Sequence, residues 1–308
     1  MMQAFANFIL SGRLQAILVA ALAAIATTWV PPYSLLLSYF GAAVVALVTL
    51  RLGASQGLLV LAGAIAVAAL VSLLTTGQAL PPVVSAMLLW WPCWMLALVL
   101  RQTVSLGMTL QAAGLMGIFV LMTVYLLHGD PGQWWLEQLS PFEAALEQHG
   151  TDLGVENAQA LIEEVSRLMT GAVVAAMMLA IIGSLLLARW WQGIVFNPGG
   201  FREEFHGLRF PSWLGLVTVT GMLVAQFNSG LPGAFSAQAA LVLLVLYLFA
   251  GLAVAHALAA NYSSGRVILI VLYLLLLFVP HVVMLLAAVG LLDTWLDFRT
   301  RFGKPVEK

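Results

Sequence analysis

LGMTLQAAGLMGIFVLMTVYLL, residues 106–127, contains no Asp, Glu, Lys or Arg. A run of about 20 apolar residues is long enough to cross the hydrocarbon core of a bilayer as a helix. Hydrocarbon offers no partner for an unpaired backbone group, so a segment of this kind crosses as a regular helix. The stretch therefore predicts a transmembrane helix.

Similar apolar runs lie on both sides of this stretch. Hydrophobic residues make up 62% of the 308 residues and charged residues only 8%, which is typical of a polytopic membrane protein. Nine runs are bounded by Arg, Pro and Gly: 14–30, 33–50, 57–74, 83–100, 106–127, 169–188, 213–227, 234–260 and 267–292. The predicted fold is an all-α, polytopic transmembrane helical bundle of eight or nine spans, with residues 1–308 forming a single transmembrane domain.

The stretch at 106–127 leads into the most acidic part of the chain. Eight of the thirteen acidic residues lie between His128 and Leu168, together with one basic residue. Short cytoplasmic loops carry an excess of Lys and Arg, and if every apolar run crosses once, the loops that carry Arg lie on one side of the membrane and this segment on the other. Residues 128–168 are therefore predicted to form an extracytoplasmic helical insertion with a solvated acidic face.

Two short helices are predicted in this insertion. Ser140-Pro141-Phe142-Glu143 has the form of a capping box, which would start a helix at Ser140. From Asn157 onward, apolar residues recur at helical spacing opposite Glu163 and Glu164, which predicts an amphipathic helix that continues into the span at Met169. The insertion could be an interfacial cover, a gating lid or a divalent-cation site, although its carboxylate spacing matches no calcium-loop pattern.

The basic residues predict the orientation. If each run crosses once, one side of the membrane receives Arg13, Arg51, Arg101, Arg189, Arg202, Arg209 and Arg266. The N-terminus is then cytoplasmic, but nine crossings would export the basic tail, with Arg299, Arg301, Lys304 and Lys308. One run is therefore expected not to cross, either the short run 213–227 or the last run, which Phe278-Val279-Pro280-His281 could break in two. About eight crossings and a cytoplasmic tail are expected.

Polar and aromatic side chains within the spans are the candidate ligand contacts, because a polar group in hydrocarbon costs free energy unless it has a partner or a role. The Trp90-Trp91-Pro92-Cys93-Trp94 cluster lies about 12 to 18 Å below Pro82, deeper than interfacial Trp residues. His281 lies beside a helix-breaking proline. The candidates are Trp90, Trp91, Trp94, His281, Gln226 and Asn228. Bundle packing is the alternative for the tryptophans, and helix capping for Gln226 and Asn228.

The sequence contains no motif for a catalytic, metal or nucleotide site. The lone Cys93 allows neither a disulfide framework nor a Cys-based metal site. The spans contain no paired carboxylates, metal-binding His motif or nucleotide-binding loop. The net charge of -1 gives no reason to expect nucleic acid as a partner. We therefore expect no catalytic residue, metal or cofactor, and a protein that is not an enzyme.

Two segments are candidate docking surfaces. Ala16, Ala20 and Ala24 recur every four residues, which lets another helix, internal or from a partner, approach closely. Residues 189–212 are predicted to form a cytoplasmic interfacial loop in which a turn at Asn197-Pro198-Gly199-Gly200 precedes a short helix. This loop could rest on lipid or receive a partner through Asn197, Gly199, Gly200, Phe201, Phe205 and Arg209.

The same loop and the tail carry a family resemblance. The segments ARWWQ (188–192), NPGGFREEFHGLR (197–209) and GLLDTWLDFR (290–299) resemble the YybS-like family of bacterial inner-membrane proteins, over nearly the whole chain. That family is distantly similar to the substrate-binding S-components of energy-coupling-factor transporters, which have fewer spans. The family has no known function, so the resemblance implies the bacterial inner membrane and a multi-span architecture, and the link to transport comes only from the distant similarity to S-components. In the tail, Asp293, Asp297, Arg299 and Arg301 are expected to pair at helical spacing on a solvated helix end.

Together these observations favour an integral membrane protein that binds a small apolar or aromatic solute from the outer side. It would act as a transporter or as a transporter-associated, S-component-like subunit. Its expected partners are the lipid bilayer, the solute and either a coupling subunit or a cytoplasmic protein. The alternative is a membrane scaffold that recruits a cytoplasmic partner through residues 197–209.

Overall fold

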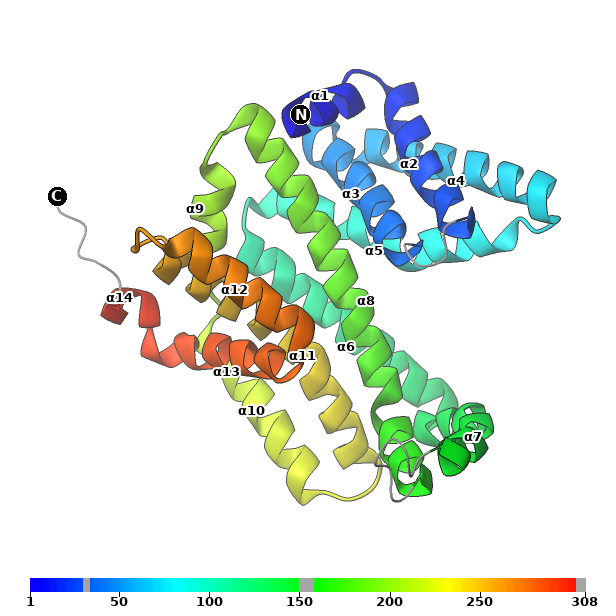
Figure 1. The fold of residues 1–308 in the computed structure, drawn as a ribbon, viewed down its shortest axis with the longest axis vertical. Helices are drawn as coiled ribbons and strands as arrows, with labels where there is room; N and C mark the ends of the chain where they lie inside the picture. The colour runs from blue at the N-terminus through cyan, green and yellow to red at the C-terminus, as the bar shows by residue number, and fades with distance from the viewer. Residues whose placement is uncertain (30–33, 150–157, 303–308) are drawn as a thin grey trace. The chain divides into compact units, whose positions relative to one another are not determined.

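The computed structural model describes residues 1–29, 34–149 and 158–302, which form fourteen α-helices and no β-strand. The predicted all-α class is therefore confirmed (Figure 1). The helices are α1 (Met2–Leu10), α2 (Arg13–Trp29), α3 (Ser34–Leu52), α4 (Ala54–Thr76), α5 (Leu80–Thr103), α6 (Leu106–His128), α7 (Pro131–His149), α8 (Ala158–Phe196), α9 (Gly200–His206), α10 (Ser212–Phe227), α11 (Leu231–Ala259), α12 (Gly265–Phe278), α13 (His281–Leu296) and α14 (Phe298–Phe302). Pro31-Pro32, Asn157, Lys304 and Lys308 lie outside the described residues.

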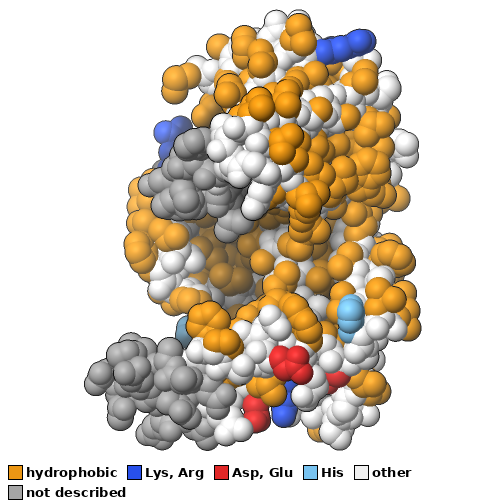
Figure 2. Space-filling view, turned by 90° about the vertical axis from the view of Figure 1, so that its right-hand side faces the viewer, with side chains coloured by type: hydrophobic (Ala, Val, Ile, Leu, Met, Phe, Trp, Pro, Cys, Tyr) orange, Lys and Arg blue, Asp and Glu red, His pale blue; other side chains and the backbone are white. Residues whose placement is uncertain are grey.

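Several of these helices suit a membrane. Five, namely α4, α5, α6, α8 and α11, are long and apolar enough to cross one, and α1 with α2 would make a sixth if that pair, bent by 116°, counts as one span. Four apolar helices are shorter, at 36–52, 212–227, 265–278 and 281–296. Hydrophobic side chains cover most of the face shown in Figure 2, a surface that suits lipid. The chain is thus an integral, multi-pass membrane protein, and the count of eight spans stays a prediction.

The chain divides into two compact units. Unit 1 comprises Met1–Ala113 and Leu179–Leu208, and unit 2 comprises Gly114–Met178 and Arg209–Lys308. Two of the three boundaries between these segments fall inside long helices, one in α6 and one in α8, and the third lies between α9 and α10.

Unit 1 is built on close helix packing around α2 and α3. Helix α2 packs against α3 and α4, and α3 packs against α5. Ala16, Ala20 and Ala24 are all buried, since small side chains let the helix backbones approach. The alanine strip therefore docks within the chain, which is the internal alternative of the prediction.

Unit 2 is centred on α11, which packs against α10 and α13. Helices α11 and α13 cross at two glycines. A Cβ atom at Gly251 would collide with the carbonyl oxygen of Leu286, and one at Gly290 would collide with that of Tyr247. Only glycine permits so close a crossing, so this contact fixes the relative positions of α11 and α13.

The last apolar run is broken into two helices. Helix α12 ends at Phe278, Val279 is extended and α13 starts at His281 after Pro280, because proline removes a backbone donor and disfavours the helical conformation of the residue before it. Figure 1 shows α12 in orange and α13 in red as an antiparallel hairpin. The predicted break is thus confirmed.

The helix boundaries of the acidic insertion differ from the prediction. Helix α7 starts at Pro131, so the capping box proposed at Ser140 is wrong, and Pro141 lies inside the helix. The Ser140 hydroxyl donates to the carbonyl of Glu137 instead. The start of α7 is explained by Asp130, whose carboxylate accepts the Gly132 amide at 2.9 Å, while proline suits the first helical position. The predicted amphipathic helix does continue into the following span, as the 39-residue helix α8.

Candidate functional site: a polar cavity and a charged cluster in unit 2

Unit 2 has two ends that are rich in charged side chains. Helix α10 connects them, and its 16 residues correspond to about 24 Å at 1.5 Å per residue. We name the end near Ser212 the arginine end, defined by Arg209, Asp293, Asp297 and Arg299. The end near Phe227 is the cavity end, defined by Asp130, Glu163, Glu164, Arg167 and Asn228.

The cavity end contains a cavity of about 750 Å³. This volume lies within the range of small-molecule sites, about 300 to 1,000 Å³. Its polar walls come from the start of α7, the first turns of α8 and the turn between α10 and α11, with Asp130, Gln133, Glu163, Glu164, Arg167, Asn228 and Ser229. The cavity therefore offers carboxylates, amides, a hydroxyl and a guanidinium to a bound molecule.

Hydrogen bonds between elements hold the walls of this cavity in place. The indole nitrogen of Trp135 donates to the hydroxyl of Thr170 at 2.8 Å, which ties α7 to α8. At the turn between α10 and α11, Gly230 has a φ of 88°, a left-handed conformation that favours glycine. A Cβ at Gly233 would collide with the carbonyl oxygen of Asn228, so this turn also depends on close backbone contact.

The buried amide of Gln238 joins three helices beside the cavity. Its nitrogen donates to the hydroxyl of Tyr125 at 2.9 Å and to the carbonyl of Arg167 at 2.7 Å, and its oxygen accepts the amide of Gly171 at 2.8 Å. The α8 groups that it contacts are four residues apart, the spacing of a helical hydrogen bond. Gly171 makes the approach possible, because a Cβ there would lie 2.8 Å from the Cα of Gln238. We call these groups the Gln238 knot.

The charges of the cavity do not neutralise one another directly. Over residues 1–29, 34–149 and 158–302, no ion pair within 4.0 Å involves Asp130, Glu163, Glu164 or Arg167. Asp130 is occupied by its cap to Gly132, and Glu163 accepts a long bond of 3.4 Å from Gln159. The charged groups are therefore available to a molecule in the cavity.

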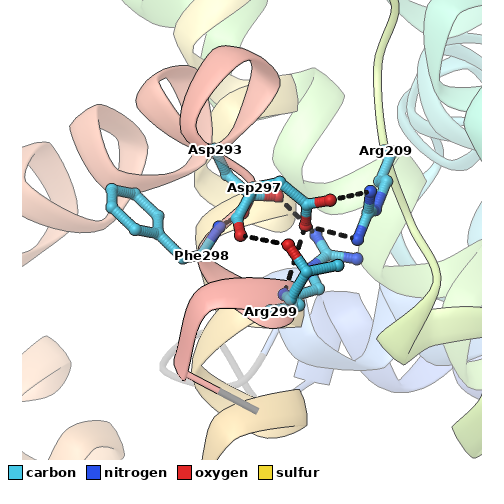
Figure 3. Close-up of polar contacts among 6 residues, drawn as sticks. Arg209, Asp293, Asp297, Phe298 and Arg299 are labelled. Carbon is cyan, nitrogen blue, oxygen red and sulfur yellow. Dashed lines mark hydrogen bonds and ion pairs between the residues drawn. The ribbon is translucent and has the colours of Figure 1, made fainter.

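The arginine end, in contrast, is a network of paired charges (Figure 3). Arg209 binds both carboxylate oxygens of Asp297, at 2.7 and 3.0 Å. Arg299 pairs with Asp293 at 3.1 Å, and the other oxygen of Asp293 accepts the amide of Phe298 at 2.8 Å. Since Asp297 follows α13 and Arg209 precedes α10, the pair places the end of α13 beside the start of α10. The tail thus begins at the arginine end.

The two ion pairs differ in burial. The side chains of Arg299 and Asp293 are 9% and 4% exposed, whereas those of Arg209 and Asp297 are 48% and 36% exposed. Burial lowers the pKa of Arg299, and the carboxylate of Asp293 opposes that shift. The hydrogen bonds from Arg209 lower the pKa of Asp297. The pair with Arg209 therefore favours the charged form of the Asp297 carboxylate.

The helical spacing predicted for the ion pairs of the tail is wrong, although Asp293 and Arg299 do pair. Asp293 pairs six residues away and Asp297 pairs 88 residues away, so neither uses a helical spacing, and Asp293 is buried. The cause is Asp297, which ends α13 in a left-handed conformation with a φ of 46°. The chain turns there, and Arg299 comes back to Asp293.

The tryptophans predicted to bind a solute make contacts within unit 1. Trp90 is 1% exposed and donates to the carbonyl of Ser38 at 3.0 Å, with Gly41 making room for its ring. Trp94 donates to the carbonyl of Ala54 at 3.2 Å, and Trp91 lies against it with ring centroids 5.3 Å apart. Two of the three indole donors thus have protein partners, an arrangement that suits the packing alternative.

The other three predicted ligand contacts are exposed and belong to unit 2. His281 is exposed at the first position of α13, at the tip of the α12–α13 hairpin. Gln226 is exposed near the end of α10. Asn228 is exposed, and it alone among the six candidates lines the cavity.

The interfacial loop is shorter than predicted and is held by contacts within the chain. Helix α8 continues to Phe196, so residues 189–196 belong to it. The turn after Asn197 is confirmed, with Gly199 at a φ of 94° and the amide of Gly200 donating to the carbonyl of Asn197. Phe205 is buried and stacks on Phe201 with centroids 5.9 Å apart. Arg209 is taken by Asp297, which leaves fewer groups for a partner.

Sequence reasoning missed the residues that build the cavity end. Gln238 is a polar residue eight positions into a long apolar helix, and the cost of such a group could have identified it. Asp130-Pro131-Gly132 could have been recognised as a cap followed by a first-turn proline. No local pattern indicated that the turn at Asn228 would face Glu163.

Comparison with known proteins does not extend this description: no protein-family model, curated protein or solved structure matched the chain.

Proposed function

We propose that this integral membrane protein binds a small polar solute in the cavity of unit 2 and acts as a transporter or a transporter-associated subunit. The observation that carries the proposal is the cavity of about 750 Å³ whose charged groups have no ion-pair partner among the described residues. The polar walls favour a polar solute in place of the apolar or aromatic one expected from the tryptophans.

The proposed orientation puts the cavity end outside and the arginine end in the cytoplasm, in accord with the excess of Arg in cytoplasmic loops. Two observations support it. Within unit 1, Arg51 lies 3.9 Å from the ring centroid of Phe196, and Arg101 donates to the carbonyl of Leu50, so these arginines share one end. Within unit 2, the tail begins beside Arg209. A reporter fused to the C-terminus should be active only in the cytoplasm, and an extracytoplasmic signal would refute this orientation.

Solute binding can be tested on the full chain in lipid nanodiscs. A panel of small polar solutes is screened for a rise in Tm, since a ligand that binds the folded state stabilises it. Ala225→Trp, which should fill the cavity, is compared with Leu223→Trp, a matched change on an exposed apolar position of the same helix. We expect a solute that stabilises the wild type and Leu223→Trp but not Ala225→Trp. Equal stabilisation of both variants would place binding elsewhere.

Uptake assays and the identification of copurifying proteins distinguish a transporter from a transporter-associated subunit and from a scaffold. Uptake of the solute by proteoliposomes containing the chain alone would support a transporter. Recovery of a coupling subunit with ATPases by mild-detergent purification and mass spectrometry would support a transporter-associated subunit and the proposed S-component-like relationship. A scaffold predicts that deletions within residues 197–208 abolish function while Ala225→Trp has no effect.

A further inference from the structure

The walls of the cavity carry an excess of negative charge. Among the described residues, Asp130, Glu163 and Glu164 contribute three carboxylates and Arg167 contributes one guanidinium, which gives these walls a formal charge of -2. These groups form no ion pair with one another among the described residues, so the excess is not removed by local pairing. A concave site lined mainly by one sign of charge attracts and concentrates solutes of the opposite sign.

The arrangement of these carboxylates favours an extended cation over a single metal ion. They come from two elements, with Asp130 before α7 and Glu163 and Glu164 on α8. In the part of the chain that the structure describes, no three His, Cys, Asp or Glu side chains are close enough to hold one metal ion. A molecule with separated positive charges can reach both walls, and a cavity of this volume can contain it.

We infer that the solute of this cavity is an organic dication, with two ammonium groups on a short aliphatic chain. Two positive charges match the formal charge of the walls, and each ammonium can donate to carboxylates. Asn228 and Ser229 supply further acceptors at the turn between α10 and α11. The inference rests on the proposed function, because it assigns a class of solute to the same cavity.

The test uses three probes with the same four-carbon chain: 1,4-diaminobutane, 1,4-butanediol and succinate. Binding to the full chain is measured by titration calorimetry at low salt, in phosphatidylcholine nanodiscs whose net charge is close to zero. We expect binding of the diamine only, weakened by added salt, because charge pairs near a surface are screened. Magnesium chloride at the concentration of the diamine tests for a simple divalent-cation site.

Substitutions in the cavity walls should change the affinity for the diamine in opposite directions, according to the charge that each removes. Glu163→Gln and Glu164→Gln should each weaken diamine binding by about tenfold, as expected for loss of a charge-assisted hydrogen bond. Arg167→Gln should strengthen it, since the formal charge becomes -3. Glu137→Gln is the matched control, because Glu137 is an exposed carboxylate of α7 outside the cavity walls, and it should leave the affinity unchanged.

Four outcomes would overturn the inference: equal or tighter binding of butanediol or succinate, binding of magnesium with the same dependence on the carboxylates, weaker diamine binding in Arg167→Gln, or no diamine binding. The proposed function fails separately, if the screen with Ala225→Trp finds no solute for the cavity. Succinate binding lost in Ala225→Trp, for example, would retain the solute site and reject the dication.

Discussion

The two ends of unit 2 use the same types of charged side chain in opposite ways. At the arginine end, two arginines and two aspartates form two ion pairs that join the end of α13, the start of α14 and the segment before α10. At the cavity end, three carboxylates and one arginine line a common space, and none pairs with another within the described residues.

This difference shows how the two ends can be told apart by mutation. Paired charges cancel much of their field and fix the elements that carry them, so their loss should reduce stability. Unpaired charges around a cavity fix little of the fold and leave a field for a ligand, so their loss should reduce binding. The loss of stability should be largest at the buried ion pair and smallest at the cavity end.

The largest effect is expected from the buried ion pair. Asp293→Asn leaves the charge of Arg299 without its carboxylate at a site where that side chain is 9% exposed. Breaking such a pair costs about 3 to 5 kcal/mol. Equilibrium unfolding of the solubilised chain should show this loss in the free energy of unfolding.

The double variant Asp293→Asn with Arg299→Met is the control for this prediction. Removing both charges should recover part of the lost stability, because the uncompensated charge is gone. A loss below about 1 kcal/mol in Asp293→Asn would mean that the pair does not hold the arginine end together.

A smaller effect is expected from the Gln238 knot, which belongs to the fold although it adjoins the cavity. Gln238→Leu keeps the size of the side chain and removes its three hydrogen bonds, at a cost of about 2 kcal/mol for the buried groups left unpaired. Gln111→Leu is the matched control, because Gln111 is half-buried and bonds only a carbonyl of its own helix. Equal losses in the two variants would contradict a special role for Gln238.

Much of the fold follows from the sequence, because a segment that crosses a membrane must be apolar and must hydrogen-bond its own backbone groups, which favours long helices. The apolar runs predicted α2 to α6, α8 and α10 to α13, and Pro280 predicted the break between α12 and α13, whereas α1 was not predicted. The crossing of α11 and α13 at Gly251 and Gly290 was not predictable, since it depends on two glycines 39 positions apart whose fit appears only in three dimensions.

The site was harder to predict than the fold, because its groups are brought together by tertiary packing. Asn228 is one of the predicted ligand contacts, yet tertiary packing alone brings it and Glu163 to the same cavity. The pair of Arg209 and Asp297 joins two of the three segments that carried the family resemblance, a link no local spacing encodes. The depth of the tryptophans in the membrane predicted ligand binding, but depth alone does not distinguish a packed side chain from one that binds a ligand.

A dependence on pH should distinguish the exposed ion pair of the arginine end. Arg209 holds the pKa of Asp297 below its ordinary value of 3.8, so the pair stabilises the fold above about pH 4 and this contribution disappears as pH falls through the lowered pKa. The difference in Tm between the wild type and Asp297→Asn should therefore narrow below pH 4. It should also narrow at 1 M salt, because both side chains are solvent-accessible. A difference that grows with acidity would contradict the assignment.

The smallest change in stability is expected at the cavity end. Glu164→Gln removes an exposed carboxylate that has no ion-pair partner among the described residues, so the free energy of unfolding should change by less than about 0.5 kcal/mol. The same variant should lose affinity for a cationic solute. If it instead destabilises the chain as Asp293→Asn does, Glu164 is a structural charge, and the contrast between the two ends fails. Loss of binding without loss of stability would show that the cavity end holds its charges for a ligand.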